Sequence, residues 1–436
     1  MAFVDNPNAW RTAQGTDIIP EHLLDTICTI SPMRTPWLST LVKMRARHYE
    51  VKFVTDELAG YGNPENGDDD VLAIAENTDA DFDPVSGWYG YHESLGTLRS
   101  WTGGKVQPYT ERRVLAFIEW VRKKWDIDPD RAFTDGRGMG GTGAIHFACK
   151  HPEQFAYVLN DQGAVDCRES NQLPTLEAAW GRVEWGLRND QGINVWDWQD
   201  LRRFVSSHGP ARDLPVLAIS PRGHTAWRDG YPRKVVGSRT KRWMRNHNTY
   251  TALFKALLDN RHMLITDFDW GPTLAILPQW MDIRRGPVPA VTDSSDKKIK
   301  DTPEGPYIFF EPSGSSPSGW IHWHHRWRPD DAVDKPDRLE MTLYVTQGEV
   351  TADVTPRRAK AFRAKPGEKF RWTNTHLAEG DRRNWSLRNI WKKYPKAEEI
   401  QSGTVTADKD GLLTVQGMII LPTKCRLVIE RQEAQP

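Results

Sequence analysis

A run of glycines between Asp128 and Gly143 carries the clearest chemical signal in the sequence, DPDRAFTDGRGMGGTG. A short segment typical of a strand, residues 131–134, leads into the glycines, and a helix pattern that starts among the glycines continues through residues 143–150. A strand, a sharp turn and a helix should therefore meet at this point. In the G-x-S-x-G pattern of many hydrolytic enzymes, such a turn presents a nucleophilic side chain at the end of the strand.

The central position of this turn is Gly138, which has no side chain that could attack a carbonyl carbon. Glycine tolerates strained backbone, and Gly136 and Gly140 would let the strand and the helix approach closely. The backbone N–H of the next residue, Met139, could still donate to an oxyanion. The sequence therefore predicts a degenerate turn that keeps an oxyanion donor and runs no serine-esterase chemistry.

Other interpretations of the glycine run stay open. It could be a tight turn in an unrelated α/β fold, or a phosphate-binding loop, although its spacing, G-x-G-x-G-G, is not that of dinucleotide-binding loops. Thr142 and Ser220 are the nearest hydroxyls in the sequence that could replace the nucleophile. Thr142 falls one turn into the expected helix, so its hydroxyl should point away from the oxyanion position.

The stretch IDPDRAFTDGRGMGGTGAIHFACKHPEQFAYVL resembles the α/β-hydrolase esterases of the feruloyl- and acetyl-xylan-esterase type, which include polyhydroxybutyrate depolymerase-like proteins. These proteins usually carry the pattern D-x-x-R-x-x-x-x-G-x-S-M-G-G. The resemblance covers residues 83–295 and includes WYGY at Trp88–Tyr91. It implies an α/β-hydrolase-like domain in which Gly138 stands at the position of the nucleophile.

The resemblance also implies an acid after a later strand and a histidine near the end of the domain. Asp229 is the only carboxylate in SPRGHTAWRDGYP, which follows the apolar run 214–219. The histidine is expected near Gly271–Thr273, where the sequence has none, and His262 precedes its expected strand. The predicted catalytic site is therefore incomplete, with Asp229 as its one candidate acid.

Alternating helix and strand patterns surround the glycine run. Residues 110–125 and 249–259 are typical of helices, whereas the apolar runs 155–159, 214–219 and 262–266 are typical of buried strands. This alternation predicts an α/β fold for residues 83–295, with a mostly parallel sheet covered by helices on both faces.

The flanking regions differ from this segment in composition and in hydrophobic pattern. Residues 302–436 contain about seven short strand patterns separated by turn residues, which predicts an all-β sandwich. Residues 61–82 are rich in Gly, Asn and Asp and are expected to be a linker. Residues 1–60 are too few for a core and should form an extended arm, with a helix at 20–30 and a strand at 48–55.

This arm is similar to the N-terminal arms of tailed-phage major head proteins. The similarity consists of ISP-x-x-TP at Ile30–Pro36 and F-x-x-D-x-L at Phe53–Leu58. It implies a virion-associated protein, or self-assembly through residues 1–60. A gene fusion and chance similarity are the alternatives.

Tryptophan and histidine gather at the start of the third region. On a strand, His322 and His324 would share one face, and Trp323 and Trp327 the other. Packing of these rings inside the protein is the favoured interpretation. Stacking of a sugar on Trp320, Trp323 and Trp327 is the second, and a metal held by the two histidines is the weakest.

Composition excludes several classes of function. Lys+Arg and Asp+Glu both number 58, so nothing favours a nucleic-acid partner, and the basic run 239–245 is interpreted as a solvated helix face. No apolar run is long enough to span a membrane, and the first residues do not resemble a signal peptide. The four cysteines are widely spaced and predict neither a metal knuckle nor a disulfide framework. We expect a soluble protein, cytoplasmic or virion-associated, without a cofactor.

These observations predict a catalytically impaired, esterase-like protein, a pseudo-hydrolase that binds a glycan or another ester-bearing ligand or has a structural role. Two alternatives stay open. One is an active carboxylic-ester hydrolase with a non-standard site, and the other is a structural or accessory protein of a phage virion.

Overall fold

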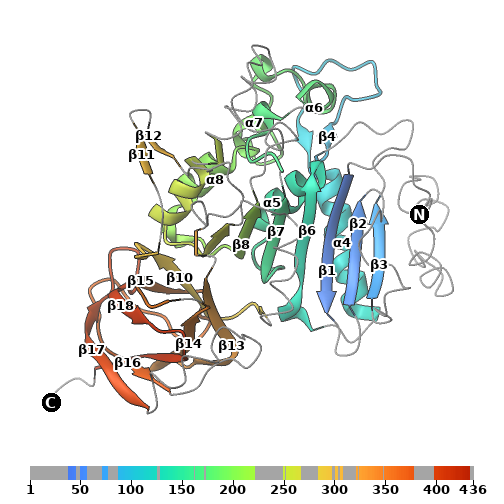
Figure 1. Cartoon of the computed structure of the whole chain (residues 1–436). Helices are drawn as coiled ribbons and strands as arrows, with labels where there is room; N and C mark the ends of the chain where they lie inside the picture. The colour runs from blue at the N-terminus through green and yellow to red at the C-terminus, as the bar shows by residue number, and fades with distance from the viewer. Residues whose placement is uncertain are drawn as a thin grey trace, which may run out of the picture. The chain divides into compact units, whose positions relative to one another are not determined.

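A computed structural model describes residues 38–45, 50–55, 71–76, 87–124, 128–161, 163–170, 173–220, 249–250, 252–266, 283–296, 300–302, 305–307, 321–322, 324–346, 348–377 and 397–432. Contacts divide the chain into two compact units. The first comprises residues 1–207 and 219–253, and the second comprises residues 208–218 and 254–436. Figure 1 shows the elements, coloured from the N-terminus to the C-terminus.

The largest sheet has seven strands in the order β3-β2-β1-β6-β7-β8-β9. Figure 1 labels β3, β2, β1, β6, β7 and β8. The strands of this sheet are β1 (Leu38–Arg45), β2 (Glu50–Thr55), β3 (Val71–Glu76), β6 (Phe133–Gly138), β7 (Tyr157–Asp161), β8 (Val216–Ser220) and β9 (Leu264–Thr266). β6 pairs in parallel with β7, and β2 in parallel with β3, whereas β1 is antiparallel to both β2 and β6. Within residues 83–295, the parallel pair of β6 and β7 agrees with the predicted mostly parallel sheet. The antiparallel pairs arise where β1 joins the sheet, because β1 enters from the N-terminal segment and not through a strand–helix–strand unit.

The N-terminal segment contributes strands to this sheet. β2 confirms the strand predicted at 48–55, and β3 falls within the segment predicted to be a linker. β1 runs along β6, with Leu38 opposite Gly138 and Lys43 opposite Phe133. The helix predicted at 20–30 lies outside the described residues. The described part of the predicted arm therefore belongs to the sheet that contains the glycine run.

The helices of the first unit follow the predicted alternation. α4 (Tyr109–Lys124) and α5 (Met139–Lys150) lie at the predicted positions. Val114, Ile118 and Val121 of α4 are buried, at the spacing of one helix face. No described helix is both long enough and apolar enough to cross a membrane.

A group of short elements precedes α4 or separates β7 from β8, and most of it was not predicted. It comprises β4 (Tyr91–His92), β5 (Val106–Gln107), α6 (Leu173–Trp180), α7 (Val195–Trp198) and α8 (Leu201–His208). Tryptophans form much of its core, since Trp180 and Trp196 are fully buried and meet edge to face at 5.1 Å. Many of the tryptophans in this part of the chain therefore serve packing.

The second unit is rich in strands, as predicted. Two antiparallel sheets have the orders β10-β15-β18 and β13-β14-β19-β16-β17, and strands of the two sheets contact each other, as β14 and β18 do. The strands are β10 (Val288–Thr292), β13 (His325–Asp334), β14 (Arg338–Val345), β15 (Val350–Arg357), β16 (Lys369–His376), β17 (Glu398–Thr406), β18 (Val415–Ile420) and β19 (Cys425–Arg431), with a separate hairpin of β11 (Lys300–Thr302) and β12 (Gly305–Tyr307). β10 precedes residue 302, so the strand-rich region begins earlier in the chain than the sequence indicated.

Candidate functional site

The glycine run forms the sharp turn that its pattern predicts. β6 ends at Gly138, and α5 begins at Met139. A Cβ atom on Gly136 would lie only 2.3 Å from the carbonyl oxygen of Gly140, which is closer than real side chains come. Glycine is therefore required at 136 because the backbones of strand and helix touch there. A second link joins the two elements, since Thr134 Oγ1 donates to Ala144 O at 3.1 Å.

The WYGY segment supports the same helix from outside. A Cβ atom on Gly143 would lie 2.6 Å from Trp88, whose ring also packs edge-on against Phe147 at 5.9 Å. Trp180 Nε1 donates to Gly90 O at 2.7 Å and ties the segment to α6. This segment is thus a packing surface for α5.

The loop after β7 fixes the first turn of α5. Asn160 Nδ2 donates to Gly141 O at 2.7 Å, and Gly163 N donates back to Asn160 Oδ1 at 3.3 Å. A Cβ atom on Gly163 would lie 2.2 Å from the backbone of Gly141. Tyr250 Oη lies within hydrogen-bond distance of Asn160 Oδ1, at 3.2 Å, and of Gly163 O. The geometry of the turn is therefore determined by its neighbours as well as by its own glycines.

The turn offers backbone donors without an attacking atom. Met139 N–H is among the first four amides of a 12-residue helix, which have no acceptor within the helix and lie at its positive end. Thr142 Oγ1 accepts a hydrogen bond from Ala164 N at 2.7 Å, and Thr142 is buried. Its hydroxyl thus holds the neighbouring loop in place. An arrangement of this kind can bind a carbonyl or carboxylate oxygen, and Gly138 supplies no nucleophile.

The comparison with known families agrees with this geometry. Residues 75–221, about a third of the chain, match the family model described as "Putative esterase". This segment is esterase-like. It contains β6, α5, β7 and β8, and an α/β esterase fold is compatible with the helices and with the parallel pair of β6 and β7 found there. No curated protein matches the chain. The narrower resemblances, to feruloyl or acetyl-xylan esterases and to phage head proteins, stay predictions.

Several predicted site residues lie outside the described residues. They are Asp229, Trp320, Trp323 and the range 271–273, where the histidine of an esterase was expected. Ser220 is the last residue of β8, and nothing is described of its side chain. The candidate acid of the esterase-like segment therefore stays a prediction.

The tryptophan–histidine cluster differs from its prediction. Trp327 lies on β13 and is 2% exposed, so it presents no ring face to a sugar. His322 and His324 do not share a strand face, because β13 begins only at His325 and His325 N donates to His322 O in a turn. In the part of the chain that the structure describes, no group of three His, Cys, Asp or Glu residues could hold a metal ion.

A serine, a histidine and an aspartate meet in the second unit. His325 Nε2 lies 3.0 Å from Ser294 Oγ and 3.4 Å from Asp296 Oδ1, and Ser294 Oγ also donates to Asp296 Oδ1. Both partners approach the same ring nitrogen, whereas a catalytic triad places the acid and the nucleophile on opposite nitrogens. These residues therefore stabilise the turn after β10, and they are not arranged for nucleophilic catalysis.

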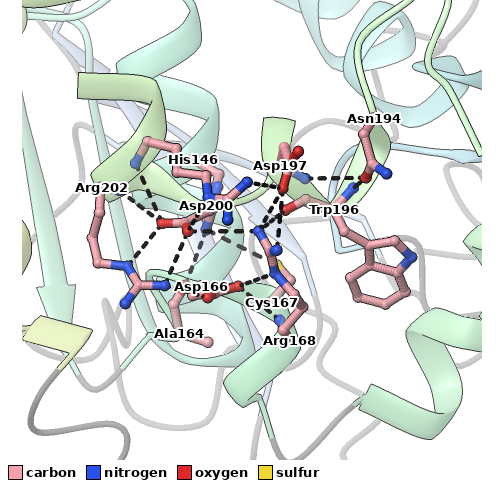
Figure 2. A network of polar contacts seen from close by, with 11 residues as sticks. His146, Ala164, Asp166, Cys167, Arg168, Asn194, Trp196, Asp197, Asp200 and Arg202 are labelled. Atoms are coloured by element: carbon pink, nitrogen blue, oxygen red, sulfur yellow. Dashed lines mark hydrogen bonds and ion pairs between the residues drawn. The ribbon is translucent and has the colours of Figure 1, made fainter. Parts of the chain in front are cut away.

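A charged network follows the loop that fixes α5 (Figure 2). It consists of two D-x-R pairs, Asp166 with Arg168 and Asp200 with Arg202. In each pair, the aspartate Oδ1 accepts hydrogen bonds from the backbone N and the Nε of the arginine, at 2.9–3.2 Å. Each arginine also reaches the other aspartate: Arg202 donates to Asp166 Oδ2, and Arg168 Nη2 lies 3.5 Å from Asp200 Oδ2. Burial and the charge of Asp200 raise the pKa of Asp166, although both arginines oppose the shift.

Three ionisable side chains are buried between α5 and this network. Burial and the charge of Lys150 hold the pKa of His146 well below its usual range, so His146 is neutral, and its Nε2 lies 3.0 Å from Ala164 O. Lys150 Nζ donates to Gln199 Oε1 at 2.6 Å and lies over the rings of Tyr89 and Trp198, and burial lowers the pKa of Lys150 to about 8. Burial also raises the pKa of the Cys167 thiol to about 12. Neutral His146 and protonated Cys167 therefore act as packing groups.

An ion pair beside α5 should make stability depend on pH. His151 Nε2 lies 2.6 Å from Glu111 Oε1. Burial lowers the pKa of His151, but hydrogen bonds and charges from Glu111 and Glu153 outweigh it and raise the pKa to about 9. Because the folded-state pKa lies above that of the unfolded chain, the stabilisation is complete below pH ~6.5 and is lost as the pH rises through about 9.

We therefore expect His151→Gln to flatten the fall in the free energy of unfolding between pH 6.5 and 9, as measured by urea denaturation. Glu111→Gln should flatten it in the same way, because it removes the other half of the pair. Parallel pH profiles for the unmodified protein and both variants would contradict this assignment.

Proposed function

We propose that the protein is a pseudo-hydrolase, an esterase-like protein whose glycine turn binds a carbonyl- or ester-bearing ligand without cleaving it. One observation supports the proposal: a strand, a sharp turn and a helix meet at Gly138, which the sequence resemblance places at the position of the nucleophile. The contact of Gly136 with Gly140 and the hydrogen bond from Asn160 support a turn of defined shape. A defined shape without a nucleophile favours binding over hydrolysis.

The chemistry of ester cleavage explains why this residue matters. Acyl transfer by this class needs an attacking oxygen and a base that takes its proton, whereas oxyanion donors alone only bind the carbonyl oxygen. Gly138 lacks the first group, and the sequence lacks a histidine at 271–273 to serve as the second. We infer that a glycan carrying ester groups is the class of ligand, because esterases of the type the sequence resembles act on such groups.

The neighbouring regions have roles within this proposal. The pairing of β1 with β6 supports an internal role for residues 38–45, since β1 borders the strand that ends in the turn. We interpret the two antiparallel sheets of the second unit as a β-sandwich appended to the esterase-like segment. Assembly into a virion would be an additional role of residues 1–60 and needs no change to the turn.

Ester hydrolysis tests the proposal directly. The unmodified protein, Gly138→Ser and the control Gly138→Ala are assayed on short acyl and feruloyl esters. We expect no turnover above the buffer rate in any of them, because a serine alone has no base to activate it. We also expect saturable binding of ethyl ferulate by ligand-observed NMR in the unmodified protein.

Turnover by the unmodified protein would overturn the pseudo-hydrolase proposal. Turnover that appears only in Gly138→Ser would show that a base and an acid are in place, which contradicts the prediction of an incomplete triad. Absence of both turnover and ester binding would leave the esterase-like segment with a structural role and would also overturn the proposal.

A further inference from the structure

A cavity of about 160 Å³ lies within the second unit, beside the segment that follows β15. Its apolar lining residues include Leu339, Phe362 and Leu412, and its charged lining residues are Arg357, Arg358, Arg363, Asp213 and Asp410. The lining is mainly polar and combines hydrocarbon with guanidinium and carboxylate groups.

Arg357 is a fixed part of the frame. Its side chain is 3% exposed, and Nε donates to Asp213 Oδ1 at 2.9 Å. Nη1 donates to Asn260 O at 3.0 Å, and Nη2 donates to Pro210 O at 2.6 Å. All of these partners belong to the second unit. Arg357 therefore holds the cavity wall in place and has its donors committed to the protein.

The backbone of Arg358 has a conformation that is uncommon for residues other than glycine. Its φ is 60°, in the left-handed region that glycine adopts without strain and other residues adopt at a cost. Strain of this kind concentrates at functional positions. Glycine would fit the backbone better at this position, yet the residue is an arginine that lines the cavity. This combination suggests that the side chain has a role in binding a ligand.

The charges of the lining favour an anion. Three arginines and two aspartates line the cavity, a formal sum of +1. Asp213 is bonded to Arg357, and Asp410 Oδ2 lies 4.0 Å from Arg261 Nη2. Guanidinium groups recognise carboxylates and other oxyanions, and the apolar lining residues favour a ligand with a hydrocarbon part. The volume is close to that of a cavity of ~150 Å³ that accepts benzene.

We propose that this cavity binds a small organic carboxylate whose apolar part is about the size of a benzene ring. The carboxylate lies toward Arg358 and Arg363, and the ring lies against Phe362 and the leucines. This site is independent of the glycine turn, which belongs to the first unit, so the proposal holds whether or not the turn binds an ester.

Isothermal titration of the full chain tests it with three probes. Benzoate has both the charge and the ring, benzyl alcohol has only the ring, and inorganic phosphate has only the charge. We expect saturable binding of benzoate, and at least tenfold weaker binding of the other two. Equal affinity for benzyl alcohol would overturn the role of the arginines, and equal affinity for phosphate would overturn the role of the apolar lining residues. No benzoate binding would overturn the site.

Two arginine variants locate the site. Arg358→Gly removes the guanidinium at a position where glycine fits the backbone, so we expect at least a tenfold loss of benzoate affinity in a protein that still unfolds cooperatively. Arg363→Gln, at an exposed position, should lose affinity to a similar extent without a change in Tm. Arg371→Gln, an exposed arginine of β16 outside the cavity lining, is the control and should bind as the unmodified protein does. Unchanged affinity in Arg358→Gly or Arg363→Gln would overturn the proposal.

Discussion

Alanine at position 136 is expected to destabilise the protein by about 3 kcal/mol or more. The added Cβ atom would lie 2.3 Å from Gly140 O and 2.4 Å from Gly140 C. Both are backbone atoms at the start of α5, so no side chain can rotate away to make room. The helix would have to move off β6, which would also strain the hydrogen bond from Asn160 to Gly141.

Urea denaturation followed by tryptophan fluorescence measures this loss. The matched control is Gly103→Ala, because Gly103 has no atom within 4 Å of the added Cβ and no positive φ. We expect the control to differ from the unmodified protein by no more than about 0.5 kcal/mol. A Gly136→Ala protein as stable as the Gly103→Ala control would show that α5 does not pack on β6 as described.

The glycine turn could be predicted because its signal is local. The strand, the turn residues and the helix follow one another within residues 131–150, and steric contact between adjacent elements requires the glycine at 136. The amphipathic pattern of α4 was equally local. The neighbours of β6 could not be predicted in this way. Alternation identifies a strand, but it does not say that residues 38–45 pair with residues 133–138.

The polar clusters show the same limit. Asp166-x-Arg168 and Asp200-x-Arg202 are common sequences when taken singly, and their significance lies in contacts across more than thirty residues. Ser294 and His325 are likewise brought together only by folding. The alternating tryptophans and histidines suggested a strand that includes His322 and His324, but the strand begins at His325 and its Trp327 is buried.

The second large loss of stability is expected from a substitution in the D-x-R network. Asp200→Ala is expected to cost about 2–3 kcal/mol, because it removes a buried carboxylate that pairs with partly exposed arginines. The Asp200 side chain is 2% exposed and contacts Arg202 at 2.9 Å, Arg168 at 3.5 Å and Arg203 at 3.6 Å. Without this carboxylate, Arg168 and Arg202 would share Asp166 alone, and the arginines would be only partly compensated.

The loss should extend to the glycine turn, since the network borders the loop that fixes α5. Cys167 N donates to Gln199 O, and Leu201 N donates to Val165 O, so Asp166 and Asp200 hold two backbone segments together. Asp197→Ala is the matched control: Asp197 also bonds to Arg168 and Arg203, but its side chain is 37% exposed, and its removal should cost less than about 1 kcal/mol. If urea denaturation gives Asp200→Ala and Asp197→Ala the same stability, burial does not strengthen the network. Its charges would then act as an ordinary surface cluster, and the turn would depend on Asn160 and the glycines alone.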